Sequence, residues 1–133
     1  MFDRKQLSHK MQELFEVKIT KDDLEEVFDF IENDTYQCEN KKYVFSIIHD
    51  AAIFNEYAED VMKASELHKA KTESLEIIRG IEKQYKNNFK IHLLETIRSH
   101  ALCINYLTGN YFKALGRMWF LLLALKEYNK NYG

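Results

Sequence analysis

Histidine and carboxylate side chains come nearest to a metal-site pattern in this sequence of 133 residues. His92, Glu95 and His100 fall within one predicted helix, but spacings of three and eight residues spread them over more than about 100° of its surface. A single metal ion needs its ligands to converge. A di-iron bundle would need a Glu-x-x-His motif on each of two helices, and the sequence has none. We therefore expect no metal site and no cofactor.

A group of three acids offers a second possible chemistry. Glu56, Glu59 and Asp60 share one face of a predicted helix and could hold Mg²⁺ together with a substrate phosphate. Acids spaced in this way more often form a solvated helix face. The sequence also lacks a P-loop, a G-x-G-x-x-G loop and a G-x-S-x-G nucleophile motif. We therefore predict a protein that is not an enzyme and assign no catalytic residue.

The charges are segregated along the chain. Residues 22–60 contain twelve acidic and two basic side chains, whereas residues 61–133 contain six acidic and twelve basic ones. Four of the basic residues recur at intervals of four, three and four, and they would form one stripe if a helix continued through them: Arg79, Lys83, Lys86 and Lys90. An aligned row of cations binds phosphate backbones, which makes a nucleic-acid-associated helical subunit the alternative hypothesis. A pI near 6.2 argues against it, because nucleic-acid-binding domains are usually strongly basic.

The elements that position these side chains should all be helices. The sequence has no proline and only four glycines, so little interrupts a helix. The composition, with 46% apolar and 30% charged residues, is that of a globular protein. At this length we expect a single all-α domain over residues 1–133, folded as a bundle of about five to six antiparallel helices.

Capping and periodicity predict where the helices begin and end. Thr20 and Asp23 have the spacing of a capping box at a helix start. A turn is predicted near HKAKTE, where Thr72 and Ser74 are candidate N-caps. The predicted helices cover residues 3–15, 21–32, 41–67, 74–85, 89–108 and 110–128.

The last predicted helix contains MWFLLLAL, eight consecutive apolar residues from Met118 to Leu125. This run is far shorter than the roughly 20 residues that cross a bilayer, so we predict no membrane span. Because the helix is apolar nearly all round, it should be the central helix of the bundle, with Trp119 and Leu122 in the core. Leu121 and Leu125 lie on another flank, which we expect to remain uncovered and to dock a second copy or an obligate partner.

One segment is similar to a known repeat. INYLTGNYFKAL resembles the middle of a tetratricopeptide repeat, with Gly109, Tyr111 and Ala114 at its turn, aromatic and small positions. The resemblance covers Ile104–Leu125 and implies a single, closely packed helical hairpin. Leu102 and Leu121 replace small residues of the pattern, and no proline ends the unit. A stable array needs roughly three such units, and no second copy follows at the repeat period.

These patterns favour a small non-enzymatic protein-binding module: a regulator, an inhibitor or immunity protein, or an adaptor. It would bind a protein or peptide through the apolar flank of Leu121 and Leu125 and through its charge patches. Cys38 and Cys103 lie far apart and outside any CxxC motif, and the first residues have no signal-peptide pattern. We therefore expect reduced thiols and a cytoplasmic location.

Overall fold

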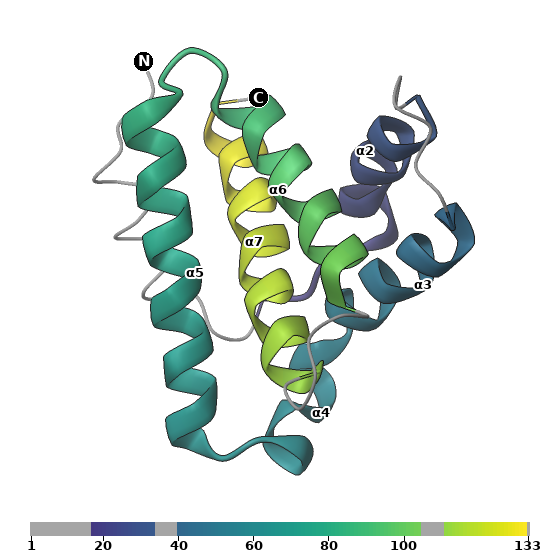
Figure 1. Cartoon of the computed structure of the whole chain (residues 1–133), viewed down its shortest axis with the longest axis vertical. Helices are drawn as coiled ribbons and strands as arrows, with labels where there is room; N and C mark the ends of the chain where they lie inside the picture. The colour runs from purple at the N-terminus through teal and green to yellow at the C-terminus, as the bar shows by residue number, and fades with distance from the viewer. Residues whose placement is uncertain (1–16, 34–39, 105–110, 133) are drawn as a thin grey trace.

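The computed structural model describes residues 17–33, 40–104 and 111–132, and every regular element in these ranges is an α-helix (Figure 1). The predicted all-α helical bundle is confirmed. The helix predicted over residues 3–15 lies outside the described residues. The six helices of the described ranges are α2 (Lys21–Glu32), α3 (Lys41–Ala52), α4 (Phe54–Val61), α5 (Ala64–Gln84), α6 (Phe89–Cys103) and α7 (Tyr111–Tyr132).

The predicted capping box opens α2. The backbone N–H of Asp23 donates to Thr20 Oγ1 at 3.3 Å, and the backbone N–H of Thr20 donates to Asp23 Oδ2 at 2.7 Å. Each bond satisfies a donor that a helix start leaves without a partner inside the helix. Lys126 of α7 lies 3.1 Å from Asp23 Oδ2 and donates to the Lys18 carbonyl at 2.6 Å. The segment before α2 is therefore attached to α7.

The prediction of one helix over residues 41–67 is wrong, because the chain bends twice in this region. α3 ends at Ala52 and α4 starts at Phe54, so Ile53 is the joint between them. α4 ends at Val61, after which Met62 has an extended backbone, with φ −136° and ψ 145°. The side chains of Phe54 and Met62 are both buried, so the bends keep apolar side chains in the core. Neither glycine nor proline marks either bend in the sequence.

The predicted turn at HKAKTE is also wrong, since these residues lie inside α5. Ser74 is no N-cap: its hydroxyl donates to the Ala70 carbonyl at 2.7 Å, within the helix. A Ser hydroxyl often bonds back to the preceding turn in this way. The turn that leads into α5 is at Met62 and Lys63 instead.

α6 buries one face. Ile91, on the opposite side of the helix, is 52% exposed. The buried residues recur every four positions, and Ile91 lies about 200° around the helix from Phe89. The buried side chains of α6 are Phe89, Leu93, Leu94, Ile97 and Ala101. The predicted continuation of this helix beyond residue 104 falls outside the described residues.

α7 is the central helix of the bundle, as predicted. In Figure 1 it runs between α5 and α6, and it contacts α3, α4, α5 and α6. Every residue from Met118 to Leu125 is buried, including Trp119 and Leu122. Such burial explains why the helix can be apolar nearly all round. None of the described helices combines the length and the apolar character needed to cross a membrane.

The prediction of an uncovered flank on α7 is wrong. Leu121 and Leu125 are 0% and 2% exposed within the single chain. Helices packed on several sides of α7 leave neither side chain accessible to a partner. The argument that placed a second copy or an obligate partner on these two leucines therefore no longer applies.

Polar contacts join α5 to α7 along the largest helix interface. Glu73 of α5 pairs with Lys113 at 2.8 Å and with Arg117 at 3.0 Å, both on α7. Ser74 Oγ also lies 3.3 Å from the Arg117 carbonyl. Of the positions that resemble a tetratricopeptide repeat, Ala114 is buried in this region, and Gly109 lies outside the described residues.

Candidate binding site

The predicted basic stripe is not continuous. α5 ends at Gln84 and α6 begins at Phe89, so a turn separates the first members of the stripe from Lys90. Lys90 forms an ion pair with Glu26 of α2. This ion pair links α6 to α2. Arg79, Lys83 and Lys86 are exposed and make no ion pair within the described ranges.

The acids divide into paired and unpaired groups. Asp23, Glu26 and Glu73 each face a cation from another helix. In contrast, α4 carries three acids with exposed side chains that have no ion-pair partner in the part of the chain that the structure describes: Glu56, Glu59 and Asp60. The interhelical pairs contribute to the fold, whereas the α4 acids leave an uncompensated negative charge at the surface.

The α4 acids and the cations Lys83 and Lys86 lie toward opposite ends of the molecule. In Figure 1, α4 lies toward one end of the long axis, and the turn between α5 and α6 lies at the other end. The acids of α4 and the cations Lys83 and Lys86 are therefore too far apart to neutralise one another, since salt screens exposed charges beyond roughly 10 Å. Two separate charged surfaces result.

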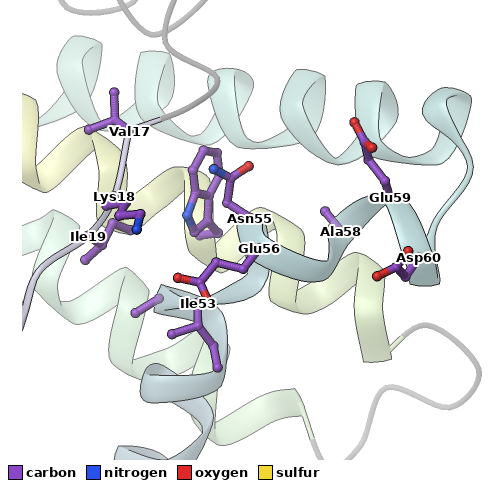
Figure 2. A pocket seen from close by; sticks show the side chains of 11 residues that line it. Val17, Lys18, Ile19, Ile53, Asn55, Glu56, Ala58, Glu59 and Asp60 are labelled. Carbon is purple, nitrogen blue, oxygen red and sulfur yellow. The ribbon is translucent and has the colours of Figure 1, made fainter.

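A pocket of about 460 Å³ lies beside the α4 acids. Residues 17–19 form one side and α4 forms the other, with Ile53 at the joint between α3 and α4 (Figure 2). Ile53 is 48% exposed, which is unusual for so large an apolar side chain. The apolar part of the lining is Val17, Ile19, Ala52, Ile53 and Ala58. Pockets of this size accept side chains and small ligands.

Trp119 of α7 also lines this pocket. The residue is only 2% exposed, and its indole Nε1 is buried without a hydrogen-bond partner among the described residues. A buried N–H that lacks an acceptor costs roughly 1–3 kcal/mol, so such groups are rare in folded proteins. The indole N–H itself has no surface exposed to solvent, so the open space of the pocket does not reach it.

A second pocket of about 380 Å³ lies on the other side of Glu59. Its lining comes from the end of α4 and the start of α5 and includes Met62, Leu67, His68 and Lys71. Lys71 already interacts with another group of the protein. With a cation and a histidine in its wall, this second pocket lacks the uniform negative charge of the first.

The histidines of the described ranges do not converge on a metal site. No group of three or more His, Cys, Asp or Glu side chains could hold a metal ion in residues 17–33, 40–104 and 111–132. His92 stacks on Tyr85 with a ring separation of 3.5 Å and lies 3.7 Å from Glu95. His92 and His100 lie eight positions apart on α6, so their side chains do not share one face of the helix.

The side chain of His100 forms a hydrogen bond within α6 and is partly buried. Its Nδ1 lies 2.9 Å from the Thr96 carbonyl, and because a carbonyl only accepts, Nδ1 carries the proton. Burial lowers the pKa of His100 below its usual value of 6.5, and the nearby positive charge of Arg117 lowers it further. The ring is therefore a neutral hydrogen-bond donor within α6.

A cluster of tyrosines surrounds Asp50. Tyr111 donates its hydroxyl to Asp50 Oδ2 at 3.3 Å, and Tyr57 donates to the Asp50 carbonyl at 3.2 Å. Partial burial, reinforced by the charge of Asp50, raises the pKa of Tyr111 to about 12. Both hydroxyls stay protonated near neutral pH, which makes them hydrogen-bond donors and poor nucleophiles.

Sequence patterns indicated only part of this site. The sequence places the α4 acids on one helix face and predicts a solvated surface there. It also predicts Trp119 in the core, but the unpaired N–H of this residue depends on how α7 packs against α4 and residues 17–19. No feature of the sequence predicts the bend at Ile53, which lies in the lining of the pocket.

Comparison with protein-family models, curated proteins and solved structures finds no match for this chain.

Proposed function

We propose that this protein is a small non-enzymatic binding module that recognises a partner protein through the acidic surface of α4. The observation that carries the proposal is the pocket beside α4, whose lining includes three exposed acids without an ion-pair partner among the described residues. A regulator, an inhibitor or immunity protein, and an adaptor all act by such binding. The partner surface should be basic.

The distribution of ion pairs supports this assignment. The acids that stabilise the fold, such as Glu73, have cations from other helices within 4.0 Å. Exposed acids contribute only about 0–1 kcal/mol each to folding when they are paired, and less when they are not. The α4 acids therefore have little value for folding, and complementary charge steers the association of proteins.

Nucleic acid binding remains the alternative, but the structure weakens its basis. Of the four stripe residues, Lys90 already pairs with Glu26, and a turn interrupts the row. The other three residues of the stripe, Arg79, Lys83 and Lys86, are exposed. A row that short releases few counterions, so binding to a phosphate backbone would be weak at physiological salt.

Charge reversal with a matched control tests the proposal. Glu56→Lys/Asp60→Lys reverses two acids four positions apart on α4, and Glu25→Lys/Asp29→Lys makes the same change at the same spacing on α2. All four side chains are exposed, so both variants should fold. Recovery of a specific partner protein in affinity capture, quantified by mass spectrometry, should fall strongly for the α4 variant and little for the α2 variant.

Two results would overturn the proposal. Equal losses in both variants would mean that the overall charge, and not α4, attracts the partner. Capture of nucleic acid that is lost in Arg79→Glu/Lys83→Glu, with no protein dependent on α4, would favour the alternative.

A further inference from the structure

We infer that α4 is a lid: a short helix that opens as a unit about joints at Ile53 and Met62 while the rest of the bundle stays folded. Opening joins the two pockets beside α4 into one groove. The motion concerns α4 alone and does not depend on the partner proposed above. Three properties of α4 support it: the joints at its ends, its few attachments to other helices and the space on both of its sides.

The joints of α4 are single residues at its two ends. At Ile53, which separates α3 from α4, the backbone has φ −98° and ψ 2°. After Val61 the chain is extended at Met62, and α5 begins at Ala64. Lid and hinge motions are absorbed by a few residues at the ends of elements. α4 can therefore turn as a rigid segment between these joints.

Few contacts attach α4 to the bundle. Of its eight residues, Phe54 and Ala58 are the buried ones. Ion pairs link α2 to α6 and α7, and α5 to α7, but none reaches α4 within residues 17–33, 40–104 and 111–132. Segments with few buried side chains open at a smaller cost in free energy than the core does.

Two contacts hold α4 in the closed position. The ring of Phe54 packs beside Gly116 of α7, where an added Cβ would be 3.3 Å from Phe54 Cε1. The hydroxyl of Tyr57 donates to the Asp50 carbonyl at 3.2 Å. This carbonyl lies in the last turn of α3, where helix carbonyls lack a donor inside the helix. The bond therefore joins α4 to α3 across the bend.

The two pockets described above lie on either side of α4. Residues 17–19 face α4 across the pocket of about 460 Å³ (Figure 2), and the start of α5 lines the pocket of about 380 Å³. Glu59 lines both pockets, so α4 is the wall between them. Open space on both flanks lets α4 move without displacing another described element.

Native-state hydrogen exchange of the whole protein tests the lid without any substitution. We expect the hydrogen-bonded amides of α4, from Ala58 to Met62, to exchange through one shared opening at low urea. Because opening uncovers Phe54 and one side of α7, its free energy should fall with urea, with a smaller slope than that of global unfolding. Amides in the middle of α7 should exchange only through global unfolding.

Two pairs of matched variants test the contacts that keep the lid closed. Tyr57→Phe removes the hydroxyl and should speed exchange in α4 about fivefold. Tyr85→Phe, at an exposed ring near the other end of the molecule, should leave it unchanged. Gly116→Ala places a methyl group against the Phe54 ring and should also speed exchange in α4, whereas Gly80→Ala meets open space and should not.

Three results would overturn the inference. Exchange of the α4 amides only with global unfolding would show that α4 does not open on its own. Protection that decreases gradually toward the ends of α4, with no urea slope, would show a helix that frays and does not move as a unit. Unchanged exchange in both Tyr57→Phe and Gly116→Ala would show that these contacts do not hold it closed.

None of these measurements includes a partner. Affinity capture can therefore still depend on the α4 acids if the lid fails, and the lid can exist if affinity capture fails.

Discussion

At the scale of single residues, some polar groups of this protein bind a partner on another helix and so stabilise the fold. Others have no partner among the described residues. Glu73 meets Lys113 and Arg117, and these cations, Lys113 foremost, hold the pKa of its carboxyl below the usual value. Trp119 Nε1 has no such partner among the described residues. Among groups of the second kind, exposed ones such as the carboxylate of Glu56 are available for binding.

The partly buried side chain of His100 predicts how stability depends on pH. The folded state lowers the pKa of His100 below 6.5, mainly through burial. The unfolded chain therefore binds the proton more readily, and the stabilising contribution is complete above pH 6.5 and decreases as the pH falls below it. We expect the melting temperature to drop between pH 7.5 and pH 5.5, and the His100→Gln variant to show a smaller drop.

The other histidines are unchanged in that variant, so the difference between the two melting curves isolates His100. An identical pH dependence in both proteins would contradict the environment described for this residue.

At the scale of helices, the short distance of α7 from α4 and α5 depends on a glycine in α7. A Cβ added at Gly116 would be 3.3 Å from Phe54 Cε1 and 3.4 Å from Ala70 Cβ. Glycine at this position lets α7 contact both α4 and α5. Gly80, near the C-terminal end of α5, has nothing within 4 Å of an added Cβ and provides a natural comparison.

The two glycines should therefore respond differently to substitution. Gly80→Ala should stabilise the protein by about 0.5–1 kcal/mol, because alanine loses less entropy in a helix. Gly116→Leu should destabilise it by about 1–3 kcal/mol through overpacking. Urea denaturation of both variants, with Gly80→Leu as the control for side-chain size, measures these changes.

A destabilised Gly80→Leu, or a Gly116→Leu as stable as the unchanged protein, would contradict the packing of α7 against α4 and α5.

Local signals account for the elements that the sequence predicted correctly. The Thr20 and Asp23 capping box depends on residues three positions apart, and the central place of α7 follows from its apolar sequence. The bends at Ile53 and Met62 depend on packing between distant segments, so periodicity alone could not reveal them. The same reason applies to the pocket: its acids are local, but Trp119 comes from α7.

At the scale of the whole molecule, the α4 acids are remote from the cations at the turn between α5 and α6. α4 lies toward one end of the long axis, and that turn, with Lys86, lies at the other (Figure 1). The formal net charge of the protein is only −2. The charge at each end therefore depends on where the charged residues lie and not on the net charge of the chain. Such a molecule presents different surfaces to acidic and basic partners.

Carbodiimide cross-linking of the protein with its captured partner tests the central claim most directly. The reagent joins a carboxylate to a lysine only where the two are in contact, and mass spectrometry identifies the joined residues. The account predicts bonds from Glu56, Glu59 or Asp60 to lysines of the partner, and none from Glu25 or Asp29. Bonds that involve only α2, or that join Lys83 and Lys86 to acids of the partner with none at α4, would contradict it.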